Sequence, residues 1–208
     1  MAIPRDPITL ADWRRTIAGL YARVRESGTG DGAAAAQAFR AARDRLFAHH
    51  PQSPIPPARR DAWRGASWFA YDPAWRVSGE FAPAGHIAHF EIPLADDGVV
   101  RCARAGTVRF RVREHEAQLA VYWFGGYGGG LWVPFTDGTS GDTTYGGGRY
   151  LYDTIKGADL GATPASFVLD FNFAYNPSCA YDERWSCPLA PGENRLAFPV
   201  TAGERMAK

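Results

Sequence analysis

The pattern of hydrophobic and polar positions divides the chain into a helical N-terminal part and a longer part with the period of β-strands. From Thr9 to Ser27, apolar residues recur at spacings of three and four, which predicts one amphipathic helix. Thr9 is predicted as its N-cap, and Gly28 lies just past its end. A second helix is predicted from Ala33 to Ala48. Its apolar side is predicted to carry Phe39, Ala42, Leu46 and Phe47.

After Trp63 apolar and polar residues alternate, as they do in strands with one buried face. Thr107–Arg113 is the clearest case, because valine and phenylalanine occupy one face and three arginines the other. No helical pattern separates the strands, which argues against a parallel arrangement. The predicted strands are Ser67–Tyr71, Trp75–Phe81, His86–Pro93, Val99–Ala103, Thr107–Arg113, Gln118–Phe124, Gly130–Pro134, Phe167–Phe173 and Asn194–Val200.

These elements predict an α+β fold that is mainly antiparallel β, either a sandwich or a barrel, with the two N-terminal helices packed against it. At 208 residues the chain is long enough for one domain with a substantial core. We expect a single domain over 1–208, with a helical pair in 1–50 and a β-rich core in 63–208.

Charge and apolar content exclude several partners. The formal net charge is only +1, so we expect no nucleic-acid partner and no attraction to an acidic membrane. No apolar run approaches the roughly 18 residues of a transmembrane helix. Arg14 and Arg15 interrupt the first apolar stretch, so no signal peptide is predicted and a cytoplasmic location is expected. Cys102, Cys179 and Cys187 are expected as free thiols there, although Cys179 and Cys187 are close enough in sequence to pair.

Two segments, Phe135–Leu151 and Leu169–Tyr181, mix glycine with aromatic and hydrogen-bonding residues. This composition is typical of a shaped polar pocket. We predict a pocket for a small anionic or carboxylate-bearing molecule, with no cofactor and no metal. The predicted ligand-binding residues are Tyr145, Arg149, Asp170, Asn172, Tyr175 and Asn176.

Arg149 and Asp170 allow a second interpretation. Arg149 follows three glycines, and its planar guanidinium suits a carboxylate or a phosphate. Asp170 and Asn172 share one face of a predicted strand, where the carboxylate could orient a donor or act as a base. Alternatively, Arg149 and Asp170 form a buried ion pair, and the polar residues are a structural network without a site.

A hydrolase or transferase using Asp170 or Cys179 is the enzymatic alternative. Either residue would need a histidine or a second carboxylate within hydrogen-bond reach, and the sequence does not place one there. The Gly-x-Ser-x-Gly elbow of a serine hydrolase is absent. His86 and His89 are three apart on a predicted strand and so face opposite sides, which makes a zinc site a weak hypothesis. The sequence leaves the question of catalysis open.

The chain resembles an uncharacterised bacterial and archaeal family, domain of unknown function 1684. The resemblance implies one domain of about this length, and it brings no established reaction, cofactor or catalytic residue. The chain departs from the family pattern at Trp63–Ala66, which changes packing only. The resemblance rests on Val133–Gly141, Thr144–Leu151, Asp170–Pro177, Cys179–Tyr181, Cys187–Leu189, Glu193–Leu196 and Ala202–Glu204, with weaker similarity at Asp44, Ser53–Pro54 and Trp68–Pro73.

Overall fold

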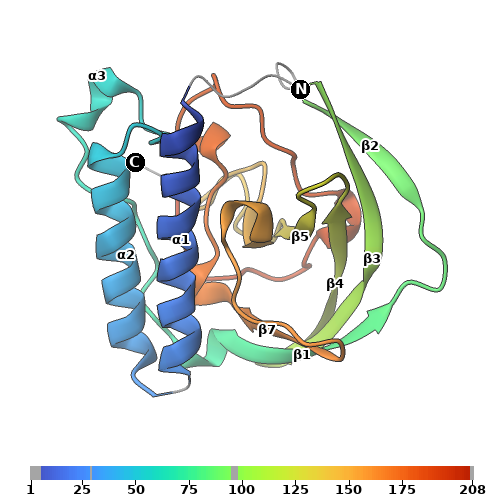
Figure 1. The fold of residues 1–208 in the computed structure, drawn as a ribbon. Helices are drawn as coiled ribbons and strands as arrows, with labels where there is room; N and C mark the ends of the chain where they lie inside the picture. Colours follow the sequence, from blue (N-terminus) through green and yellow to red (C-terminus); the bar gives the residue numbers. More distant parts are fainter. Residues whose placement is uncertain (1–5, 29, 95–97, 207–208) are drawn as a thin grey trace.

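The computed structural model describes residues 6–28, 30–94 and 98–206, and it shows a helical pair beside one curled antiparallel sheet (Figure 1). The predicted α+β class, mainly antiparallel, is confirmed. The sheet curls into a half-barrel, and the helices together with the C-terminal loops lie along its open side (Figure 1). The arrangement is therefore closer to the predicted barrel than to a sandwich.

Both long helices are capped by an aspartate. Asp6 accepts a hydrogen bond from the backbone N–H of Thr9 at 3.0 Å, so the predicted cap at Thr9 was wrong. The helix begins earlier because Pro7 has a preset φ and lacks the N–H that a first-turn residue leaves unused. Gly28 ends the helix with a φ of 57°, as the sequence predicted. The helices are α1 (Pro7–Ser27), α2 (Gly32–His49) and α3 (Pro57–Arg60).

The strands pair in the order β6-β5-β4-β3-β1-β7, and β2 pairs with β3 outside this path. Every strand pairing is antiparallel. The strands are β1 (Arg76–Pro83), β2 (His89–Leu94), β3 (Gly98–Val112), β4 (His115–Phe124), β5 (Gly130–Phe135), β6 (Arg149–Asp153) and β7 (Ser166–Asp170). Short 3-10 helices precede, join and follow the strands: η1 (Pro73–Trp75) before β1, η2 (Thr154–Lys156) between β6 and β7, and η3 (Phe171–Phe173), η4 (Ser178–Ala180) and η5 (Gly192–Asn194) after β7.

Several predicted strand limits were wrong. Val99–Ala103 and Thr107–Arg113 form one strand, β3, because a bulge between Arg104 and Gly106 interrupts the alternation without ending the ladder. Phe167–Phe173 ends as a strand at Asp170, where the chain turns into η3.

Two other segments differ from their predicted state. Residues 67–71 and 194–200 form only single bridges in the described chain, Trp68 with Glu204 and Thr136 with Arg195. β6 was missed because all five of its residues are buried, so the alternation that marks a half-buried strand is absent.

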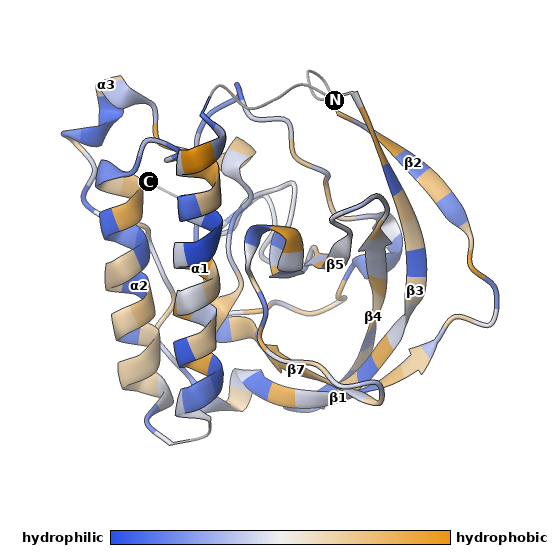
Figure 2. Ribbon diagram, in the orientation of Figure 1, coloured by the Kyte–Doolittle hydropathy of each residue, from blue (hydrophilic) through white to orange (hydrophobic). Residues whose placement is uncertain are grey.

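The main core lies between α1 and the concave face of the sheet. Alternating hydrophobic and hydrophilic bands along β3 mark the two faces (Figure 2). The predicted apolar stripe of α1 is buried at Ile17, Leu20, Tyr21 and Val24. In the described chain no helix combines the length and apolar character that crossing a bilayer requires.

The last described residues cross the open side of the half-barrel. The N–H of Gly138 donates to the carbonyl of Phe198 at 3.1 Å, and the N–H of Phe69 donates to that of Gly203 at 3.0 Å. Leu196, Phe198 and Val200 are buried, whereas the residues between them are exposed. This segment is therefore hydrogen-bonded both to the loop after β5 and to the segment before η1.

Candidate functional site

Arg149 begins β6 and is fully buried. Its Nη2 lies 2.8 Å from Oδ2 of Asp137 and donates to the carbonyl of Val200 at 3.0 Å. Its Nη1 donates to the carbonyls of Ala202 and Glu204, the latter at 3.2 Å. Both terminal nitrogens are thus occupied, and Arg149 fastens the C-terminal segment to the sheet.

Asp170 forms a second cluster at the end of β7. Its Oδ2 accepts from Arg76 at 3.1 Å, so the predicted Arg149–Asp170 ion pair was wrong. Its Oδ1 accepts from the side-chain amide of Asn172 at 3.0 Å, and that amide also donates to the carbonyl of Asp72 at 2.9 Å. Burial raises the pKa of Asp170, while the hydrogen bonds from Asn172 and Arg76 oppose the rise. These contacts join the end of the sheet to the loop before η1.

Tyr145 contacts a thiol rather than either cluster. Its hydroxyl donates to Sγ of Cys179 at 3.6 Å. Burial is the main cause that raises the pKa of Tyr145 to about 12, and the hydrogen bond to Cys179 adds to it. The six predicted residues therefore do not share one pocket.

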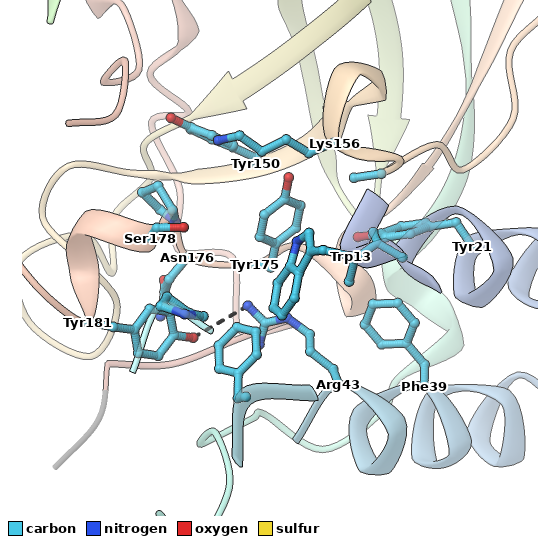
Figure 3. Close-up of a pocket in the computed structure, with 15 residues that line it drawn as sticks. Trp13, Tyr21, Phe39, Arg43, Tyr150, Lys156, Tyr175, Asn176, Ser178 and Tyr181 are labelled. Atoms are coloured by element: carbon cyan, nitrogen blue, oxygen red, sulfur yellow. Dashed lines mark hydrogen bonds between the residues drawn. The ribbon is translucent and has the colours of Figure 1, made fainter. Parts of the chain in front are cut away.

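A cavity lies between the helical pair and the C-terminal loops, and Tyr175 and Asn176 are the predicted residues that line it (Figure 3). Its volume of about 60 Å³ exceeds the roughly 10–15 Å³ that one water molecule needs, so it has room for several water molecules or for a carboxylate group. Aromatic walls with a few polar groups are usual in small-molecule sites. Its other lining residues are Trp13, Ile17, Tyr21, Phe39, Arg43, Phe47, Pro54, Tyr150, Lys156, Ala158, Pro177, Ser178 and Tyr181.

Arg43 of α2 is the charged residue at the centre of this cavity (Figure 3). It is only 4% exposed, and its Nη2 lies 3.0 Å from Oε2 of Glu204 and 3.4 Å from the hydroxyl of Tyr181. Its guanidinium carbon lies 4.2 Å from the ring centroid of Phe47. The sequence prediction omitted Arg43, although a spacing of four from both Phe39 and Phe47 places it on their face.

Three buried polar atoms of cavity-lining residues have no hydrogen-bond partner within the described chain. They are the hydroxyl of Tyr21, Nη1 of Arg43 and Oδ1 of Asn176. The Asn176 amide nitrogen donates to the carbonyl of Arg205 at 3.0 Å, which fixes the orientation of the side chain. Eight further buried side-chain nitrogens, in residues that do not line the cavity, also lack a partner among the described residues. Because buried polar groups are nearly always paired, the three cavity atoms have unused hydrogen-bonding capacity.

The charges around the cavity favour an anion. Burial raises the pKa of Glu204, although Arg43 opposes the rise. Burial also raises the pKa of Tyr21, which keeps its phenol neutral. Lys156 is a second cation at the cavity. Its side chain is 47% exposed, and its Nζ forms an ion pair with Oδ2 of Asp153 at 3.5 Å. Arg43 is therefore balanced by one carboxylate of elevated pKa, and Nη1 is left to donate.

The contacts of Asp170 and Cys179 bear on the enzymatic alternative. The hydrogen-bonding side chains against Asp170 are those of Arg76 and Asn172, and the hydroxyl of Tyr145 donates to Cys179. Neither a histidine nor a second carboxylate lies within hydrogen-bond reach of Asp170 or Cys179 among the described residues. No group of three histidine, cysteine or acidic side chains there could hold a metal ion.

The family model described as protein of unknown function, DUF1684, matches residues 61–205. The chain belongs to this family. The resemblance noted in the sequence is thus confirmed. In this DUF1684 protein the match covers the sheet, the cavity-lining Asn176 and the Arg43 partner Glu204, whereas Tyr21 and Arg43 lie before it.

A solved structure supports the fold of the DUF1684 protein. The chain is similar to the uncharacterized protein of Haloarcula marismortui determined by solution NMR, with 38% sequence identity and a TM-score of 0.62. The similarity covers 81% of this chain and 91% of the other. No curated protein matches the chain.

Proposed function

We propose that this DUF1684 protein binds a small anionic or carboxylate-bearing molecule in the cavity around Arg43. The observation that carries the proposal is that three buried polar groups with unused hydrogen-bonding capacity belong to one aromatic-lined cavity. Leaving such groups unpaired costs about 1–3 kcal/mol each, and a polar ligand would recover that cost. We further propose a cytoplasmic location, which three free cysteines support.

The unpaired atoms define the chemistry of the ligand. Nη1 of Arg43 and the hydroxyl of Tyr21 are donors that suit the oxygens of a carboxylate or phosphate. Oδ1 of Asn176 accepts only, so it requires a hydroxyl or amine on the ligand. The rings of Trp13 and Phe47 offer apolar surface to the remainder.

Three of the residues predicted from the sequence are related to this cavity, two by direct contact and one through an intervening residue. Tyr175 and Asn176 line it directly. Arg149 acts from behind, because it binds the carbonyl of Glu204, and the carboxylate of Glu204 in turn holds Arg43. A binding role for these residues thus coexists with a structural role for Arg149.

The test is a thermal-shift titration of the wild type and the Tyr21→Phe variant with a panel of small carboxylates and inorganic phosphate. The Tyr21 hydroxyl has no partner in the described chain, so its removal should not lower the free energy of unfolding and should raise it by up to about 1–3 kcal/mol, the cost of leaving that hydroxyl unpaired. If the ligand uses that hydroxyl, affinity should fall by about 0.5–1.5 kcal/mol, the net value of one hydrogen bond.

Tyr152→Phe is the matched control. The Tyr152 hydroxyl lies 2.8 Å from the carbonyl oxygen of Gly161 and 2.7 Å from that of Val168, so its one hydrogen is shared between these two acceptors, and Tyr152 is not among the residues that line the cavity. We expect this variant to lose about 1–3 kcal/mol of stability while its ligand response is unchanged. The proposal fails if no anion stabilises the wild type, or if Tyr21→Phe binds as tightly as the wild type does.

A further inference from the structure

The ion pair of Arg43 and Glu204 is buried next to the cavity. Nη2 of Arg43 lies 3.0 Å from Oε2 of Glu204, and the two side chains are 5% and 1% exposed. The same carboxylate oxygen accepts a hydrogen bond from the backbone N–H of Asn176 at 2.9 Å. Glu204 is not among the residues that line the cavity, whereas Nη1 of Arg43 has no partner in the described chain. An anion bound to Nη1 therefore shares one guanidinium with Glu204.

Two further cations near this ion pair are already paired with carboxylates. Asp137 lies 2.8 Å from Arg149, and Asp153 lies 3.5 Å from Lys156. Arg43 and Glu204 likewise balance each other, so an added anion brings an uncompensated negative charge. The ionisable side chains that face Glu204 or its partner are Arg43 and Asp44 of α2, Tyr21 of α1, Arg149 of β6 and Tyr181 after η4.

We propose, on the basis of the anion site around Arg43, that the bound molecule is a monocarboxylate and that Glu204 takes up one proton from the solvent as it binds. Two anions that share a buried site disfavour each other's charged form, so one of them becomes protonated. A proton on Glu204 leaves the guanidinium and the bound carboxylate as a neutral pair. A dianion such as phosphate leaves one buried negative charge uncompensated even then, which is costly.

Burial favours the neutral form of Glu204 even before a ligand binds. It raises the pKa of Glu204, and the Asp44 carboxylate adds to the rise, whereas Arg43 is the first of the groups that oppose it. An anion that binds Arg43 weakens this opposing effect, so the pKa of Glu204 rises further in the complex. Affinity is therefore constant below the pKa of Glu204 in the free protein and falls as the pH rises above it.

The experiment is isothermal titration calorimetry of the full-length protein with acetate, glycolate, lactate, benzoate and inorganic phosphate between about pH 5 and pH 9. Each titration is repeated in two buffers of different ionisation enthalpy, because the difference in heat gives the number of protons taken up. For a bound carboxylate we expect this number to approach about one, with affinity falling by up to about tenfold per pH unit. At about pH 8, phosphate should bind more weakly than the tightest carboxylate.

Glu204→Gln replaces the carboxylate with a neutral side chain of the same shape. This variant should bind the carboxylate without proton uptake, lose the pH dependence, and bind more tightly than the wild type at about pH 8. Glu193→Gln is the matched control, because Glu193 is also held by an arginine and a tyrosine but does not line the cavity. Its carboxylate lies 3.0 Å from Arg104 and 2.6 Å from the hydroxyl of Tyr122. Glu193→Gln should keep the proton uptake of the wild type.

The outcomes separate this inference from the proposed function. If a carboxylate binds the wild type without proton uptake across the whole pH range, or if phosphate binds more tightly than every carboxylate at about pH 8, the inference is overturned and the anion site stands. If none of the five anions binds, the anion site fails, and the inference fails with it. The wild-type titrations need no variant, so they test the inference even if Glu204→Gln does not fold.

Discussion

Replacing Arg149 with lysine tests whether the planar guanidinium, rather than the positive charge, holds the C-terminal segment in place. The two terminal nitrogens of Arg149 serve four buried acceptors: the Asp137 carboxylate and the carbonyls of Val200, Ala202 and Glu204. A lysine ammonium keeps the charge but has three N–H groups on a single nitrogen.

The loss follows from counting acceptors. At least one of the four acceptors is left unpaired, and a buried unsatisfied acceptor costs about 1–3 kcal/mol. We expect Arg149→Lys to fold with its stability lowered by that amount, which is a large part of the roughly 5–15 kcal/mol of a typical protein. Arg149→Leu should lose more, about 3–5 kcal/mol, because it leaves the buried Asp137 carboxylate without a cation, although Thr139 and the N–H of Val200 still donate to it.

The assay is urea unfolding followed by tryptophan fluorescence, which the seven tryptophans make sensitive. Arg76→Lys is the control, since Arg76 donates one bond to Asp170 and its side chain is 17% exposed. Arg76→Lys should cost less than about 1 kcal/mol. If Arg149→Lys proves as stable as Arg76→Lys within roughly 0.5 kcal/mol, the four-acceptor account of Arg149 is refuted.

Two further substitutions probe buried polar groups. Burial raises the pKa of Glu204 above its ordinary value of about 4.3. The stability that comes from protonated Glu204 is thus fully present below that pH and is lost as the pH rises through the folded-state pKa. The unfolding free energy of the wild type minus that of Glu204→Gln, measured in urea, should therefore decrease as the pH rises above about 4, and a constant difference would contradict this reasoning. Asn194 is fully buried, accepts from the N–H of Ala120 at 2.7 Å and donates to the carbonyls of Ala120 and Pro134 at 3.0 and 2.7 Å. Asn194→Ala should lose about 2–4 kcal/mol at its urea midpoint, and a loss below 1 kcal/mol would show that water replaces the amide.

The helices were predictable because their signals are local. The stripe of Ile17, Leu20 and Val24 fixes one face of α1 whatever packs against it. The start of the helix was harder to predict, because Asp6 and Thr9 are both good caps and Pro7 decides between them.

The strands show that the alternation of apolar and polar residues does not by itself predict which segments pair in the sheet. Residues 194–200 alternate between buried and exposed, as predicted for a strand, yet their carbonyls and amides bond to single residues such as Thr136 rather than to a neighbouring strand. Alternation reports an extended backbone with one buried face, and ladder formation depends on long-range partners. β6 illustrates the reverse, a ladder strand whose residues are all buried.

The candidate cavity shows a related limit of the sequence. Tyr175 and Asn176, which the sequence assigned to a polar pocket, are among the residues that line it. Arg43 was missed because it is one of three arginines in an alanine-rich helix, where an arginine resembles a solvent-facing residue. Its partner Glu204 is distant in the sequence, and nothing local indicates the pairing.

The pairing of Arg43 with Glu204 has a consequence for the order of folding. Contacts between neighbouring residues form quickly, whereas those that close long loops form slowly. The helical hairpin of α1 and α2 can therefore form early. The cavity is completed only when the C-terminal segment that carries Glu204 packs against α2. We expect the cavity to be absent from every partly folded state, so that any molecule bound there selects the chain whose folding is complete.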